Sequence, residues 1–194
     1  MTFLVGDIGN TLTKICLINF NFKIIKSFSI ETNKLNKKNY QNIFFNKILK
    51  YKVNKKILFS SVVPLIYKVI KKNLSKKKYK IFELKNLKIS KIVTLNVNKI
   101  NQVGSDRIAN AIGAYEYYKN NCLVIDFGTA TTFDIISKKG IYEGGVIAPG
   151  VNLSIMNLNK FTASLPILKL RSNAKSYGKN TKDALNAGFI WGYQ

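Results

Sequence analysis

Short apolar runs separated by polar turns fill the first 31 residues of the chain. The runs TFLVGDI, TLTKICLINF and KIIKSFSIE are rich in β-branched and aromatic residues, and Gly9 and Asn10 lie in the first turn. Runs of this length and composition are typical of β-strands. The pattern therefore predicts an N-terminal β-meander.

Helices and strands alternate from there to about residue 84. Apolar residues recur at helical spacing over 40–52, KILFSSVV is typical of a strand, Pro64 can open a helix that continues to about Leu74, and KKYKIFEL indicates another strand. This alternation predicts a layered α/β domain. The lysine-dotted stretch over 85–99 is typical of a solvated surface or loop.

Three helices are expected in the second half. Ser105 or Asp106 can cap a helix over 106–118, whose apolar side chains fall on one face: Ile108, Ala111, Ile112 and Tyr115. GGVIAPG at 144–150 is interpreted as a glycine-rich bend into a second helix, or as plain turn and packing glycines. Thr181 opens the third, TKDALNAGFIWG, either as its N-cap or as a substrate contact.

The segment NCLVIDFGTATTFD repeats the N-terminus at a constant offset of 119 positions. The matching residues are Leu4, Val5, Asp7, Gly9 and Thr13, which correspond to Leu123, Val124, Asp126, Gly128 and Thr132. We interpret the match as an internal duplication. It predicts two lobes, 1–117 and 118–194, each beginning with a strand, an aspartate and a glycine turn.

Composition excludes several kinds of chemistry. Of the 194 residues 46% are hydrophobic, enough for one core or two small ones, and none is histidine. The absence of histidine excludes Ser-His-Asp hydrolysis, Cys-His chemistry and His-ligated zinc. Cys16 and Cys122 lie far apart in apolar runs and are predicted to be buried thiols. Catalysis must use carboxylates, hydroxyls, amides and cations.

The formal net charge of +23 would ordinarily suggest a nucleic-acid partner. Apart from Arg107 and Arg171 every basic residue is lysine, and Asn and Ile are abundant. This bias is typical of an AT-rich genome, so we expect no specific nucleic-acid binding. No window approaches the roughly 18 apolar residues of a membrane helix, and polar residues come too early for a signal peptide. We expect a cytoplasmic protein without membrane association.

Two groups of residues carry candidate chemistry. Gly9 and its neighbours fit a tight turn that presents backbone N–H groups to phosphate oxygens, although Walker and dinucleotide-binding motifs are missing. Asp7 is either a magnesium-associated carboxylate or an Asx-turn aspartate, and its copy at Asp126 favours the former. Asp106 and Arg107 are either a helix cap with a solvated arginine or a functional pair. The scarcity of arginine in this chain favours the pair.

Six segments, in this order and spacing, resemble the type III pantothenate kinase family: DIGNT, SSVVP, GSDRIANAIGA, VIDFGTATTFD, GGVIAPG and FTASLP. The resemblance covers almost the whole chain. It implies an α/β, actin-like ATPase (ribonuclease H-like) fold with two duplicated lobes. The second lobe would be shortened at its C-terminal end, since the family continues to a late Thr-Gly-Gly segment near the nucleotide.

The resemblance implies ATP-dependent phosphorylation of pantothenate to 4′-phosphopantothenate, the first step of coenzyme A biosynthesis, by a homodimer. Asp106 would be the catalytic proton acceptor, and Asp126 would bind a monovalent cation (K⁺ or NH₄⁺), with Asp7 associated with Mg²⁺. ATP would contact Asp7, Ile8, Gly9, Asn10, Thr11, Leu12, Thr13, Lys14 and Thr129. Pantothenate would contact Gly104, Ser105, Asp106, Arg107 and Thr181.

One position departs from the family pattern inside the substrate pocket. Val97 stands where the family usually has an aromatic residue, so one wall of the pocket is expected to differ. The alternative function is that of a non-catalytic Baf-like regulator or binding protein on the same scaffold.

Overall fold

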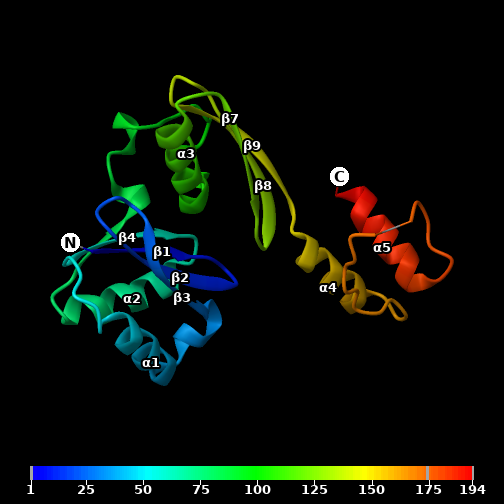
Figure 1. The fold of residues 1–194 in the computed structure, drawn as a ribbon, viewed down its shortest axis with the longest axis horizontal. Coiled ribbons are helices and arrows are strands. Elements are labelled where there is room, and N and C mark those ends of the chain that lie inside the picture. The colour runs from blue at the N-terminus through cyan, green and yellow to red at the C-terminus, as the bar shows by residue number, and fades with distance from the viewer. Residues whose placement is uncertain (1, 174, 194) are drawn as a thin grey trace. The chain divides into compact units, whose positions relative to one another are not determined.

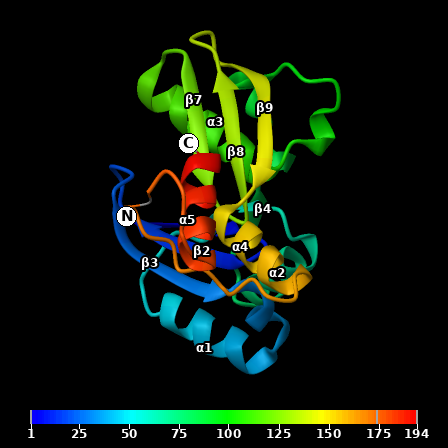
Figure 2. The ribbon, with the colours of Figure 1, turned by 90° about the vertical axis from the view of Figure 1, so that its right-hand side faces the viewer.

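The computed structural model describes residues 2–173 and 175–193 and contains two β-sheets (Figures 1 and 2). The chain divides into two compact units. One unit comprises Met1–Val124 and Asp134–Gly144, and the other comprises Ile125–Phe133 and Gly145–Gln194. The lobes expected from the repeat, 1–117 and 118–194, rest on the sequence and stay a prediction.

The first sheet has the strand order β3-β2-β1-β4-β5. Its strands are β1 (Phe3–Ile8), β2 (Leu12–Ile18), β3 (Ile24–Glu31), β4 (Lys56–Ser61) and β5 (Lys80–Glu83). β1, β2 and β3 pair antiparallel, so the expected meander is confirmed, whereas β4 and β5 extend the sheet parallel to β1. An antiparallel meander extended by parallel strands in this order is the ribonuclease H-like arrangement of an actin-like lobe.

Helices α1 (Lys38–Ile48) and α2 (Pro64–Lys76) connect the parallel strands. Pro64 lies in the first turn of α2, where its missing N–H has no helical partner to lose. Apolar side chains of both helices form one cluster with the sheet: Leu4, Ile8, Ile15, Leu17, Leu35, Phe44, Phe45, Ile48, Ile57, Phe59, Ile66, Ile70 and Leu74. The two helices therefore cover the same face, beside the meander in Figure 1.

A second cluster forms around α3 (Ser105–Tyr118). Ile108 and Ala111 of this helix pack with Ile136 and Tyr142, and Leu58 of β4 packs against the same cluster. Because Leu58 alternates with Ile57 and Phe59, α3 lies on the face of the first sheet opposite α1 and α2. The expected lysine-rich loop over 85–99 contains short 3-10 turns and one two-residue strand, β6 (Thr94–Leu95).

The second sheet has the order β6-β9-β8-β7. It contains β7 (Cys122–Phe127), β8 (Ala130–Ile136) and β9 (Ile141–Pro149). The bounds of β7 are those of β1 displaced by 119 positions at both ends, and β8 begins one residue earlier than the same displacement of β2 would place it. The repeat found in the sequence is thus a repeat of strand, turn and strand.

GGVIAPG leads into a helix as expected, but the segment itself is the end of a strand and not a bend. The strand β9 continues through this segment to Pro149, and α4 (Val151–Phe161) begins only after Gly150. Gly144 adopts a φ of 111° within the strand, so this glycine serves a local irregularity and does not end the strand. The last helix, α5 (Thr181–Gly192), has the expected bounds.

Candidate functional site

The GSDR segment forms the N-terminus of α3. Gly104 occupies the N-cap position, so the expectation that Ser105 or Asp106 caps the helix is wrong. Instead, Asp106 Oδ1 accepts a hydrogen bond from the backbone N–H of Arg107 at 2.8 Å. A Cβ atom at position 104 would overlap Asp106 Oδ1. Glycine at 104 therefore leaves the space that this carboxylate occupies.

Ser105 is anchored from the first sheet. Its hydroxyl donates to Glu83 Oε1 at 2.7 Å, and both side chains are buried. Glu83 ends β5, so the hydrogen bond ties the start of α3 to the carboxyl end of a parallel strand. The negative charge of Glu83 also contributes, after burial, to raising the pKa of Tyr67. Glu83 was not among the expected site residues, because a Glu at a strand end gives no signal by itself.

Arg107 is anchored from the opposite side, by β8. Its Nε donates to Asp134 Oδ1 at 2.7 Å, and the Asp134 side chain is fully buried. Tyr142 also donates to Asp134 Oδ1, at 2.8 Å. The alternative of a solvated arginine is therefore wrong, since the Arg107 side chain is only 14% exposed. Asp106 thus lies between two residues that are each held by a buried carboxylate.

The start of α3 lies beside the ends of β1 and β4. An ideal Cβ at Gly104 would be 3.6 Å from Val62 Cγ1, and the Val62 backbone N–H donates to Ile8 O at 3.1 Å. The carboxyl ends of neighbouring parallel strands are where α/β folds commonly bind ligands. Within this unit the structure therefore brings together the two segments that the sequence singled out, 7–14 and 104–107.

The first glycine turn joins β1 to β2. Gly9 N–H donates to Leu12 O at 3.0 Å, and Asp7 and Lys14 are opposite each other in the antiparallel pair. Of the segment 7–14, Ile8 and Thr13 are buried, whereas Asp7, Thr11 and Lys14 are exposed. Ile8 is thus a core residue, and the polar side chains of the turn remain accessible.

Thr32 supports this turn and was missed in the sequence. Its hydroxyl donates to Gly9 O at 2.7 Å and lies 3.0 Å from the Thr13 hydroxyl, while its backbone N–H donates to Thr11 O. Thr32 is 3% exposed. The one feature of the sequence that could have indicated Thr32 is that it carries a hydroxyl directly after the third strand of the meander.

The second glycine turn, between β7 and β8, belongs to the other unit. Gly128 N–H donates to Ala130 O at 3.0 Å, and Gly150 N–H donates to Thr129 O at 3.0 Å. A Cβ at Gly150 would overlap the backbone of Gly128 and Thr129. Gly150 is therefore a packing glycine that lets the start of α4 approach the turn. Asp126 and Thr129 are both exposed.

Thr181 is the first residue of α5 and is exposed. The N-cap of this helix is Asn180, whose Oδ1 accepts from Asp183 N–H, so the cap interpretation of Thr181 is wrong. Thr181 lines a mainly apolar pocket of about 450 Å³ together with side chains of α4 and α5, among them Leu158, Leu185 and Phe189. A polar side chain in such a pocket can contribute to recognition.

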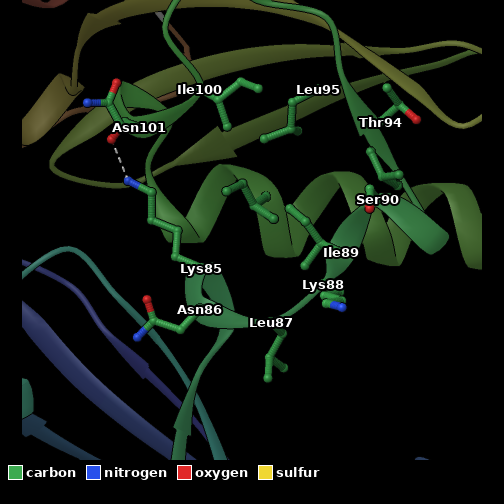
Figure 3. Close-up of a pocket in the computed structure, with 12 residues that line it drawn as sticks. Lys85, Asn86, Leu87, Lys88, Ile89, Ser90, Thr94, Leu95, Ile100 and Asn101 are labelled. Atoms are coloured by element: carbon green, nitrogen blue, oxygen red, sulfur yellow. Dashed lines mark hydrogen bonds between the residues drawn. The ribbon is translucent and has the colours of Figure 1, made fainter.

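A pocket of about 630 Å³ lies between α3 and the segment over 85–101 (Figure 3). Leu87, Ile89, Leu95 and Ile100 give it apolar walls, and Lys85 donates from its edge to Asn101 O. None of the expected site residues lines it. Val97 is half-buried and packs against the core cluster around α3.

A metal site with three or more protein side-chain ligands of the usual kinds is not found in the part of the chain that is described. There, no three His, Cys, Asp or Glu side chains gather into a cluster. Mg²⁺ in nucleotide sites typically uses one or two protein carboxylates together with phosphate oxygens and water. The exposed carboxylate of Asp7 beside a glycine turn fits that requirement, and Asp126 offers the same arrangement in the second copy.

The sheet order and the repeated strand-turn-strand define an actin-like α/β protein. The family model for type III pantothenate kinase matches residues 3–194. A type III pantothenate kinase of Pelagibacter ubique is 45% identical over 98% of this chain and 76% of the relative. One of Desulforapulum autotrophicum is 35% identical over 97% of this chain and 74% of the relative. The chain belongs to the type III pantothenate kinase family.

A solved structure supports the fold. A Campylobacter jejuni protein assigned to the Baf family of transcriptional activators superposes with a TM-score of 0.57 and 23% identity, over 98% of this chain and 75% of that one. At this identity the likeness concerns the fold alone. The expected actin-like fold and the kinase interpretation are confirmed, and the curated matches favour the kinase over a non-catalytic regulator.

No described helix has the length and apolarity to cross a membrane.

Proposed function

We propose that this chain transfers the γ-phosphoryl group of ATP to the primary hydroxyl of pantothenate, and that Asp106 accepts the hydroxyl proton. The observation that carries this proposal is the placement of Asp106. Its carboxylate is fixed by the N–H of Arg107 and lies in the space left by Gly104, beside the ends of β1 and β4. A carboxylate suffices as the base, because phosphoryl transfer through a loose transition state demands little proton abstraction.

The glycine turns are proposed to bind the triphosphate. The backbone of 7–14 and its exposed side chains would contact ATP, as would Thr129. Phosphate oxygens need oriented N–H donors and positive charge, and Lys14 lies in β2 directly after the first turn. In this proposal Asp7 holds Mg²⁺ and Asp126 a monovalent cation, K⁺ or NH₄⁺. When bound, these ions neutralise phosphate charge.

The start of α3 is proposed to bind pantothenate. Gly104, Ser105 and Arg107 would line the site around Asp106, and Thr181 is proposed as a further contact to pantothenate. Pantothenate is anionic, and Arg107 offers the planar guanidinium that suits a carboxylate. We further propose a cytoplasmic homodimer that binds no specific nucleic acid. The Baf-like regulatory alternative has no observation in its favour beyond the shared fold.

The direct test is to incubate the purified chain with ATP, Mg²⁺, K⁺ and pantothenate and to detect 4′-phosphopantothenate by mass spectrometry. Asp106→Asn keeps the size of the side chain and an acceptor oxygen but removes the base. We expect turnover to fall by roughly 10² to 10⁴, the usual contribution of a positioned general base. Near-full activity of Asp106→Asn would refute the assignment of the base, and an inactive but folded unmodified chain would refute the proposed function.

A further inference from the structure

A buried carboxylate of β8 fixes the arginine of the site. Asp134 is fully buried, and its Oδ1 accepts from Arg107 Nε at 2.7 Å while Arg107 Nη2 lies at the same distance. Nη2 nevertheless makes no well-aligned hydrogen bond, because one oxygen receives both nitrogens. The pair therefore engages the Nε and Nη2 side of the guanidinium, and Nη1 remains outside it.

Tyr142 of β9 reinforces this arrangement in two ways. Its hydroxyl donates to the same Asp134 oxygen at 2.8 Å, and its ring lies 5.7 Å from the guanidinium carbon of Arg107. Tyr142 as a whole is 1% exposed. Burial, and after it the hydrogen bond to Asp134, raises the pKa of Tyr142 well above its ordinary value. Tyr142 is thus a constant neutral donor over the physiological range of pH.

Arg107 is also the direct neighbour of Asp106, the proposed base. The backbone N–H of Arg107 is the donor that holds Asp106 Oδ1, and both residues lie in the first turn of α3. An arginine side chain held at only one point would keep several rotatable bonds, and its ordering on substrate binding would then oppose that binding. Here the guanidinium is ordered by contacts that belong entirely to the protein.

We propose that Asp134, assisted by Tyr142, is a positioning residue of the phosphoryl-transfer site that holds Arg107 with its Nη1 side directed at an anionic group of the acceptor substrate. This inference rests on the proposed function. Asp134 itself does not touch substrate. Its effect reaches the reaction through the guanidinium of Arg107.

A structural role alone makes a different prediction from a positioning role. If Asp134 only stabilised the fold, its variants would lower the melting temperature and leave the Michaelis constants of the folded fraction unchanged. If it positions Arg107, Asp134→Asn should raise the KM for pantothenate more than the KM for ATP. We expect kcat/KM for pantothenate to fall about 10- to 100-fold, the range found when partners that orient the ligands of a metal site are removed.

Three companion variants separate the causes. Asp134→Glu keeps the charge and should recover part of the loss, whereas Tyr142→Phe keeps the ring and should show a smaller change in the same direction. Ile136→Val is the matched control, since Ile136 is fully buried in the same strand and bears no polar group. It should lower stability slightly and leave the KM for pantothenate unchanged.

A spectroscopic measurement tests the geometry independently of activity. The chain has two arginines, so ¹⁵N–¹H spectra of the Nε–H groups contain two signals. The side chain of Arg107 is 14% exposed and that of Arg171 is 59% exposed, which makes Arg171 an internal reference. In the unmodified chain the Arg107 signal should exchange slowly with water, and in Asp134→Asn it should shift and exchange faster.

The outcomes decide between the proposals. A changed Arg107 signal together with a raised KM for pantothenate supports the positioning role. A changed signal with unaltered kinetics overturns it, and so does an unchanged signal in folded Asp134→Asn. If the unmodified chain makes no product, the proposed function fails. The Arg107 signal and calorimetric binding of pantothenate then show whether Asp134 orders a binding site: weaker binding by Asp134→Asn supports this, and equal or absent binding overturns it.

Discussion

The two copies of the strand-turn-strand repeat share a pattern but differ in burial. In the first copy Leu4 is 2% exposed and Ile8 is fully buried, because α1 and α2 cover that face of the sheet. Their counterparts in the second copy, Leu123 and Phe127, are 60% and 75% exposed. The apolar pattern of a strand therefore predicts on which face of the sheet a side chain lies. Whether that face is covered depends on other segments of the chain.

The two turns differ in how they are supported. After the strand that follows each copy, β3 or β9, the chain returns to the turn: Thr32 N–H donates to Thr11 O beside the first copy, and Gly150 N–H donates to Thr129 O beside the second. The first copy adds the Thr32 hydroxyl, which donates to Gly9 O. The second copy instead brings backbone against backbone at Gly150. One turn is held by a side chain and the other by close packing.

The largest expected difference concerns burial. Ile8→Ala should lower the free energy of unfolding by about 2–5 kcal/mol, the range for truncating a buried aliphatic side chain. Phe127→Ala, at the corresponding position of the second copy, should change it by no more than about 0.5 kcal/mol. Urea unfolding followed by circular dichroism measures both. Equal losses in the two variants would show that Phe127 is covered in solution and would remove the contrast.

Gly150→Ala tests the packing of the second turn. The new Cβ would collide with backbone carbonyl groups that cannot rotate away, so we expect a loss of about 1–3 kcal/mol, as for overpacked sites. The KM for ATP should also rise, since Thr129 carries the turn that is displaced. Gly113→Ala is the control, because nothing lies within 4 Å of its Cβ, and a helical Gly→Ala change should stabilise by roughly 0.5–1 kcal/mol. Unchanged stability in Gly150→Ala would contradict the packing argument.

Thr32→Val tests the side-chain support of the first turn. Val151 occupies the corresponding position of the second copy, at an offset of 119, so the variant makes the two copies alike. It leaves Gly9 O without its buried hydroxyl donor, and we expect a loss of about 1–3 kcal/mol in the free energy of unfolding and a higher KM for ATP. Thr32→Ser keeps the hydroxyl, so it should keep most of the stability of the unmodified chain and a KM for ATP close to the unmodified value. Equal effects of Val and Ser would exclude the hydrogen bond as the cause.

The same contrast explains which features of the fold and of the candidate site could be predicted from the sequence. Strand and helix periodicity located the elements of the first unit, and the offset of 119 located β7, because these signals are local. The motif residues Asp106 and Arg107 were found for the same reason. Glu83, Asp134 and Thr32 were not, since a buried polar residue becomes recognisable only when its partner across the sheet is known. The helix after GGVIAPG was predicted, but the segment itself was interpreted as a bend because its glycines and proline outweighed the β-branched residues between them.

The smallest expected difference between the two copies concerns the two free cysteines. Cys16 lies in β2 and is 9% exposed, as expected of a buried thiol, whereas Cys122 at the start of β7 is only half-buried. Thiolates react with Ellman's reagent only where the reagent can reach them. Cys122 should therefore be modified first under native conditions, and Cys16 only as the first sheet opens. Cys122→Ser should abolish the fast phase, and Cys16→Ser should leave it intact. A fast phase that survives in Cys122→Ser would mean that the first sheet opens as readily as the second, which the burial of Leu4 and Ile8 argues against.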